Sequence, residues 1–187
     1  MTGVQTCALP ISQNVVDVVS IASVGGIRAD LVPGMLALPD QIIDYTYGRS
    51  ATFFDQSDRS VTHVDFTHPY CAELRRRIAA AATATGENLV ETGTYAATQG
   101  PRLETAAEIN RFERDGADMV GMTGMPEAAL ARELGLCYAT IAVVVNYAAG
   151  RGTSQDGVRL EDINTVSRSA MARVRSVLDQ LVSANGD

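Results

Sequence analysis

The sequence contains no lysine, so its fifteen basic residues are all arginines, and twenty-two acidic residues outnumber them. The net charge of −7 and a single short basic run, Arg75–Arg77, argue against a polyanionic partner such as nucleic acid. Hydrophobic runs long enough to span a membrane are also missing, since a run such as Ile141–Val145 is far too short to cross a bilayer. We therefore expect neither nucleic acid nor a membrane as a partner.

The motifs of several enzyme classes are missing as well. The sequence has no Gly-x-Ser-x-Gly elbow of a serine hydrolase and no Gly-x-Gly-x-x-Gly fingerprint of a dinucleotide-binding fold. Cys7, Cys71 and Cys137 lack the spacing of a metal site, and we interpret them as reduced thiols in the cytoplasm. His63 and His68 lack the i, i+4 partner that a helical zinc site requires. We expect no metal and no organic cofactor.

Residues 1–12, MTGVQTCALPIS, have no basic start and no apolar core of the length found in signal peptides. The string resembles the translation of a sequencing-library adapter. The following segment, Val15–Ile21, is almost entirely apolar, which is typical of a strand buried on both faces by neighbours. We therefore expect a non-native leader at 1–12, an authentic sequence that starts near Gln13, and an N-terminal part that is missing. Residues 13–187 would then be the C-terminal two-thirds of one domain, with an exposed sheet edge.

Periodicity along the chain predicts strands that alternate with helices. With 187 residues, 46% of them hydrophobic, the chain can bury one core, and a single domain is expected. The predicted strands are 15–21, 88–98, 118–122 and 137–145, and the predicted helices are 69–85, 105–116, 126–135 and 160–183. Thr105 and Glu108 fit a capping box at the start of the second helix. This order predicts an α/β fold with a largely parallel sheet.

Three polar residues follow the carboxyl ends of predicted strands: Glu104, Thr123 and Asn146. Because ligands of α/β folds bind at these ends, we expect the three residues to share a site. Glu104 can accept a hydrogen bond from the N1–H of a 6-oxopurine, and the amide of Asn146 can reach the purine O6 and N7. Thr123, with free backbone N–H groups at a helix start, can bind phosphate. Each residue also has a structural alternative: a helix-dipole contact for Glu104, a turn for Asn146 and a helix cap for Thr123.

Several short motifs extend this pattern over the chain from Val15 to the C-terminus. They are Gly93-Thr94-Tyr95, Gly100-Pro101-Arg102, Gly116-Ala117-Asp118, Gly121-Met122-Thr123, Pro126-Glu127 and Cys137-Tyr138-Ala139-Thr140. Together they resemble the trimeric purine nucleoside phosphorylases and 5'-methylthioadenosine phosphorylases. The resemblance implies that family's fold, a mixed, largely parallel sheet flanked by helices and here incomplete at the N-terminus. It also implies a cytoplasmic homotrimer that uses inorganic phosphate as co-substrate and no cofactor.

The resemblance implies roles for the residues around the base and the phosphate. Glu104 and Asn146 match the catalytic pair that binds 6-oxopurines, whereas the adenine-specific branch has Ser and Asp at these places. Ser23 matches a backbone contact with phosphate, and Thr123 matches the phosphate-binding hydroxyl. Met122 matches the residue beneath the ribose, and Leu103 is implied to contact the substrate.

Three further residues are implied at the 5' end of the sugar. His63 matches a residue that a neighbouring subunit contributes there. Leu160 and Ile163 stand roughly where inosine-type enzymes have a histidine, and apolar side chains suit a methylthio group better than a 5'-hydroxyl. We therefore expect both to contact the substrate.

The implied reaction is phosphorolysis of a 6-oxopurine nucleoside in purine and methionine salvage. The expected substrate is S-methyl-5'-thioinosine, which would give hypoxanthine and 5-methylthioribose 1-phosphate. Phosphorolysis of inosine, guanosine or 5'-methylthioadenosine, and nucleoside binding without catalysis, remain open. The family's N-terminal glycine-rich phosphate loop and Arg-His segment have no counterpart in the sequence, so we expect the chain to be inactive by itself.

Overall fold

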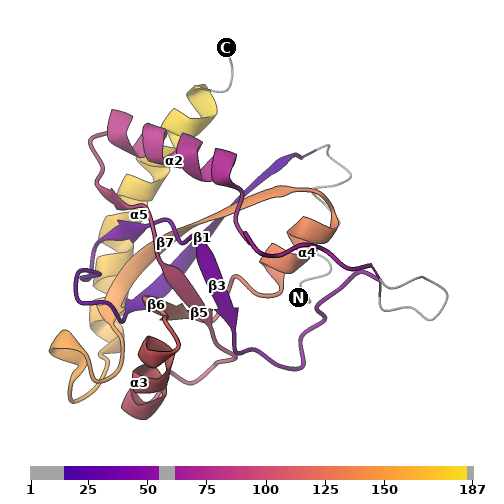
Figure 1. Cartoon of the computed structure of the whole chain (residues 1–187). Coiled ribbons are helices and arrows are strands. Elements are labelled where there is room, and N and C mark those ends of the chain that lie inside the picture. The colour runs from indigo at the N-terminus through magenta and orange to yellow at the C-terminus, as the bar shows by residue number, and fades with distance from the viewer. Residues whose placement is uncertain (1–14, 55–61, 185–187) are drawn as a thin grey trace.

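A computed structural model describes residues 15–54 and 62–184 of the chain (Figure 1). The predicted leader, residues 1–12, lies outside the described residues. The strands are β1 (Asp17–Gly26), β2 (Leu36–Ala37), β3 (Gln41–Asp44), β4 (Leu89–Val90), β5 (Thr94–Ala97), β6 (Met119–Gly121) and β7 (Cys137–Tyr147). The helices are α2 (Ala72–Ala84), α3 (Ala106–Arg114), α4 (Glu127–Glu133) and α5 (Leu160–Ser183), with a short 3₁₀ turn, η1 (Gly152–Ser154).

The strands form one seven-stranded sheet in the order β3-β5-β6-β1-β7-β2-β4. Four strand pairs are parallel, whereas β1 with β6 and β2 with β7 are antiparallel, so the predicted mixed, largely parallel sheet is confirmed. Two short connections show that the sheet curls strongly. Residues 38–40 join β2 to β3, and residues 91–93 join β4 to β5, although the strands of each pair lie at or near opposite ends of the strand order. Three residues span only about 10 Å, so the two ends of the sheet lie close together.

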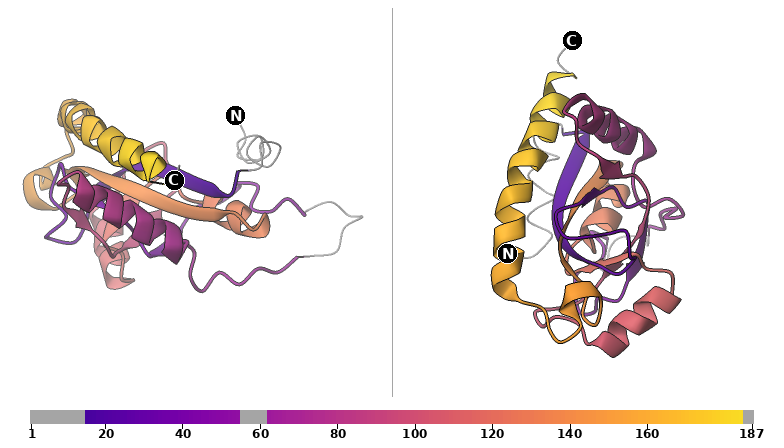
Figure 2. Two further views of the ribbon diagram at one scale, coloured as in Figure 1. Left: turned by 90° about the horizontal axis from the view of Figure 1, so that it is seen from above. Right: turned by 90° about the vertical axis from the view of Figure 1, so that its left-hand side faces the viewer.

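The core fills both sides of β7. Residues 139, 141, 143 and 145 pack with α2 and α5, whereas Ala142 and Val144 belong to a second cluster with Tyr95 and Met119. The prediction of a fully buried strand is therefore confirmed. In Figure 2, α5 runs along the outside of the curled sheet with α2 packed beside it, and α3 covers the opposite end of the molecule.

β1 is paired differently along its length. All of it pairs with β7, but only Gly25 and Gly26 pair with β6, so within the described residues Asp17–Val24 have a strand neighbour on one side only. The prediction that Val15–Ile21 is buried on both faces is wrong, because Val16 is 71% exposed and the rest of this segment is half-buried. Among the described residues, the predicted sheet edge lies along Asp17–Val24.

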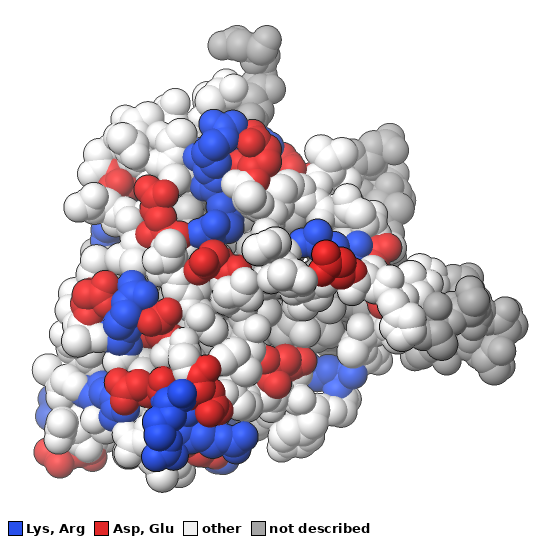
Figure 3. Space-filling model, in the orientation of Figure 1, with Lys and Arg blue, Asp and Glu red and all other residues white. Residues whose placement is uncertain are grey.

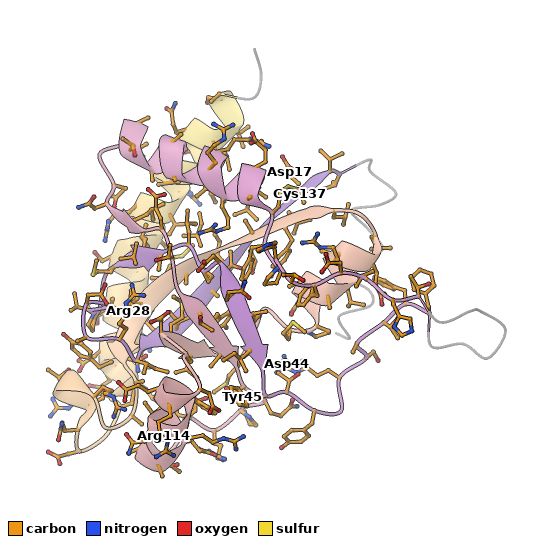
Figure 4. All side chains as sticks on the ribbon, viewed as in Figure 1. Asp17, Arg28, Asp44, Tyr45, Arg114 and Cys137 are labelled. Carbon is orange, nitrogen blue, oxygen red and sulfur yellow. A yellow bond between two sulfur atoms is a disulfide. The ribbon has the colours of Figure 1, made fainter. Side chains whose placement is uncertain are left out.

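Cys71 and Cys137 form a disulfide, which corrects the prediction of reduced thiols. They lie 66 residues apart in sequence, but folding brings their Cα atoms to 5.2 Å, a separation that a disulfide bridges readily. The backbone N–H of Cys71 also donates to the carbonyl of Tyr138 at 2.8 Å. Figure 4 labels Cys137 beside Asp17, its partner in the β1–β7 register. The link ties the start of α2 to the start of β7.

Charges of both signs are interspersed over the face shown in Figure 3. The basic run on α2 is matched by acceptors: Arg76 pairs with Glu73, Arg77 pairs with Asp17, and Arg75 donates to backbone carbonyls. The run is therefore engaged in structural contacts. No helix of the described residues is long and apolar enough to cross a membrane.

Candidate functional site

A cavity of about 420 Å³ lies where β1, β6 and β7 end, between the segment before α3 and the start of α5. Its wall contains these predicted site residues: Ser23, Leu103, Glu104, Met122, Thr123, Asn146 and Ile163. Because they come from five separate segments, only the fold brings them together. His63 and Leu160 do not line it; both are exposed, Leu160 to 65%.

Glu104 is held by a neighbour that sequence reasoning did not identify. The hydroxyl of Thr98 donates to Glu104 Oε1 at 2.7 Å. Helix capping at this point is performed by Thr105 and Glu108, which form the predicted capping box, so the side chain of Glu104 is not the cap of α3. The carboxylate therefore lines the cavity and is oriented from one side by Thr98.

A break in register places Asn146 at the cavity. Val24 pairs with Val144, but the next residue of β1, Gly25, pairs with Asn146, so β7 carries one extra residue, Val145. Such bulges redirect side chains and are common beside active sites. The Asn146 amide donates to the carbonyl of Tyr147 at 2.6 Å, which leaves its second N–H and its oxygen for a ligand. Gly25 permits this packing, since a Cβ there would lie 3.3 Å from Asn146 Nδ2.

Thr123 is positioned by a buried tyrosine. The hydroxyl of Tyr95 accepts from the Thr123 backbone N–H at 3.2 Å and lies 3.1 Å from the Thr123 hydroxyl. The expectation of a helix start with free N–H groups at Thr123 is wrong, because α4 begins at Glu127 and this N–H already has a partner. Burial raises the pKa of the Tyr95 phenol, which therefore stays protonated and can donate to the threonine oxygen. That arrangement leaves the Thr123 hydrogen free for an anion.

Arg49 connects the two segments that carry Glu104 and Thr123, and sequence reasoning missed it as well. Its guanidinium donates to the carbonyls of Thr98 at 3.1 Å, Gln99 at 3.2 Å and Met122 at 3.1 Å, and also to that of Met125. This role depends on backbone carbonyls far from Arg49 in the sequence, so no local motif indicates it.

The cavity wall is otherwise apolar. Val120, Val145, Ala148, Ala149, Val158 and Ile163 all contribute to it. None of the described residues that line the cavity is cationic, so Ser23 and Thr123 would meet an anion without a balancing positive charge. In the described part of the chain, no three His, Cys, Asp or Glu side chains are grouped so that they could hold a metal ion.

Curated relatives share this sequence over most of its length. A probable S-methyl-5'-thioinosine phosphorylase of Xanthomonas campestris pv. campestris is 54% identical over 153 residues, which are 82% of this chain and 61% of that protein. A 6-oxopurine nucleoside phosphorylase of Pyrococcus furiosus is 48% identical over 138 residues, covering 71% of this chain and 52% of the relative. The chain thus spans about three-fifths of the length of the first of these relatives and about half of the second.

The fold is also that of solved nucleoside phosphorylases. Methylthioadenosine phosphorylase from Schistosoma mansoni in complex with adenine superposes with a TM-score of 0.90 at 27% sequence identity, over 96% of this chain and 69% of that one. The profile of the phosphorylase superfamily matches residues 5–183. The chain therefore belongs to the phosphorylase superfamily.

Proposed function

We propose that the protein acts in phosphorolysis of a 6-oxopurine nucleoside, with S-methyl-5'-thioinosine as substrate and hypoxanthine and 5-methylthioribose 1-phosphate as products. The observation that carries the proposal is the meeting of Glu104, Asn146, Met122 and Thr123 in one cavity. Relatives named for S-methyl-5'-thioinosine and for 6-oxopurine nucleosides support the substrate class.

The base is recognised by complementary hydrogen-bonding groups. An ionised carboxylate only accepts, so Glu104 suits the N1–H of hypoxanthine, whereas N1 of adenine carries no hydrogen. Asn146 would donate its free N–H to O6 and accept from N7–H as the base leaves. The purine receives the electron pair of the broken bond to the sugar and takes up a proton at N7. In the overall balance, hydrogen phosphate gives up this proton when its oxygen bonds to C1'.

Phosphate attacks C1' of the sugar while the bond to the purine breaks, through a cationic, oxocarbenium-like sugar. In this proposal Ser23 and Thr123 bind the phosphate, and Met122 packs beneath the ribose. Positioning and electrostatic stabilisation then account for the catalysis. Because the described cavity wall lacks a cation, we expect the isolated chain to bind the base well and to turn over slowly or not at all.

Apolar residues of the cavity wall support a methylthio group at the 5' position of the sugar. Val158 and Ile163 line the cavity, and both suit a methylthio group, whereas a 5'-hydroxyl would lose hydrogen bonds there. Leu160 lies one helical turn before Ile163 and is exposed, so it does not line the cavity. Val158, which sequence reasoning did not select, takes its place beside Ile163 in the proposed contact with the 5' substituent. Relatives named for 6-oxopurine nucleosides favour inosine or guanosine as the second candidate substrate.

We further propose that residues 13–187 belong to one nucleoside phosphorylase domain, and that the protein is a homotrimer located in the cytoplasm. His63 is exposed and lies outside the cavity of its own chain, so it is available to contact the substrate in the cavity of a neighbouring subunit. The cytoplasm is proposed because nucleosides and inorganic phosphate are metabolites of the cell interior; the disulfide adds no support for it.

The test measures hypoxanthine binding to the purified chain by calorimetry, and then hypoxanthine release from S-methyl-5'-thioinosine and inosine at one fixed phosphate concentration. We expect Glu104→Gln to weaken hypoxanthine binding about tenfold, because a charged hydrogen bond is lost. Glu91→Gln, at an exposed position outside the cavity, is the matched control. A wild-type chain that binds no hypoxanthine and releases none from either nucleoside would refute the proposal. If the Xanthomonas campestris relative binds hypoxanthine but releases none from either nucleoside, a non-catalytic nucleoside-binding role is favoured.

A further inference from the structure

Thr98 is a buried polar residue directly after β5, and it contacts both Gly121 of β6 and Glu104. It is only 7% exposed, and its backbone N–H donates to the carbonyl of Gly121 at 2.8 Å. Its hydroxyl lies 2.7 Å from Glu104 Oε1 and 3.2 Å from the same Gly121 carbonyl. A threonine hydroxyl has one hydrogen to donate, and the shorter distance and the negative charge favour the carboxylate as its acceptor.

Glu104 stands between two cavities, and Thr98 lies on one side of it. Besides the 420 Å³ cavity, Glu104 lines a neighbouring cavity of about 240 Å³ together with Thr98, Tyr47 and Arg102. Arg102 is a competing partner for the carboxylate, although it is now paired with Glu108 at 2.7 Å. With Oε1 engaged by Thr98, Oε2 is the oxygen left for a ligand in the larger cavity.

We propose that Thr98 is a positioning residue that sets the preference for 6-oxopurines over 6-aminopurines by holding the Glu104 carboxylate against the base. The inference rests on the proposed function. A fixed carboxylate accepts from the N1–H of hypoxanthine but faces the lone pair of adenine N1, so it favours one base and opposes the other. Released from Thr98, the carboxylate can turn toward the smaller cavity, and both effects weaken.

The experiment measures dissociation constants for hypoxanthine and adenine by calorimetry in the wild-type chain, Thr98→Val and Thr98→Ser. We expect Thr98→Val to weaken hypoxanthine binding about tenfold and to leave adenine binding unchanged or tighter, so that their ratio falls about tenfold. Thr98→Ser keeps the hydroxyl and should retain the wild-type ratio. Thr140→Val, a change at another buried threonine, which lies in β7 outside both cavities, should leave both constants unchanged.

The outcomes separate this inference from the proposed function. A wild-type chain with no preference for hypoxanthine over adenine overturns the 6-oxopurine assignment and the role of Thr98 with it. A wild-type preference that persists in Thr98→Val, or equal weakening of both bases, overturns only the role of Thr98. If Thr98→Val does not fold, Thr98→Ala removes the same hydroxyl with a smaller side chain. The ratio of its dissociation constants for hypoxanthine and adenine then tests the role of Thr98.

Discussion

Reduction of the Cys71–Cys137 disulfide should destabilise the protein without changing its affinity for the base. The bond closes a loop of 66 residues, and the entropy that such a closure removes from the unfolded chain corresponds to about 4 kcal/mol at 25 °C. In a chain of 187 residues this loss should lower the melting temperature by about 10 °C. The hydrogen bond from Cys71 N–H to the Tyr138 carbonyl survives reduction, so the start of α2 should keep its place.

The assay is urea unfolding with and without a reductant, in a Cys7→Ser background that removes the third thiol. Cys71→Ala/Cys137→Ala should unfold as easily as the reduced protein and should not respond to reductant. Neither Cys71 nor Cys137 lines the 420 Å³ cavity, so hypoxanthine affinity should stay within about twofold of the oxidised protein. A change in unfolding free energy below about 1 kcal/mol on reduction would refute the reasoning, because a 66-residue loop cannot close at so small an entropic cost.

Tyr95→Phe removes the hydroxyl that holds Thr123, so urea unfolding should show a loss of about 1 kcal/mol; an unchanged midpoint would contradict this role. Gly121→Ala places a Cβ 2.4 Å from the Tyr95 hydroxyl, and this overpacking should cost about 1–3 kcal/mol in the same assay, with a neutral result as the contrary outcome. Hydrogen bonds from Arg102 and from the Thr105 backbone lower the pKa of Glu108 from 4.5 to about 2. Glu108 thus stabilises the fold above pH 4.5, and this contribution is lost as the pH falls toward 2. Because the side chain is 36% exposed, solvent screening reduces the contribution to about 1 kcal/mol. The stability gap between wild type and Glu108→Gln should therefore narrow as the pH falls from 4.5 to about 2, and a constant gap would count against this role.

Local patterns were sufficient to predict the main elements. The last helix was predicted at 160–183 and occurs as Leu160–Ser183, because its apolar residues recur every three or four positions. The capping box at Thr105 and Glu108 was predicted from two residue types at fixed spacing. The convergence of Glu104, Thr123 and Asn146 on one cavity was predicted, because polar residues after the strands of an α/β sheet meet at one edge of it.

Features that depend on distant contacts were not predicted. The expected strand 88–98 is two strands, and β4 and β5 pair with partners at opposite ends of the sheet order. Residues 36–37 and 41–44 are too short for any periodicity, so β2 and β3 were missed. Cys71 and Cys137 show no motif, and their pairing follows from where α2 and β7 begin in space. Thr98, Tyr95 and Arg49 act on the site through other residues, which no spacing in the sequence reveals.

The extra residue in β7 has a consequence for how the strand tolerates change. From Ile141 to Val144, side chains alternate between two apolar clusters, so their volume is the main constraint on them. After Val145, the shifted register brings Asn146 to the 420 Å³ cavity without interrupting that alternation. One continuous strand thus combines a packed core segment with a cavity-lining residue, and we expect an exchange of one aliphatic residue for another between Ile141 and Val144 to change the stability of the fold without displacing Asn146.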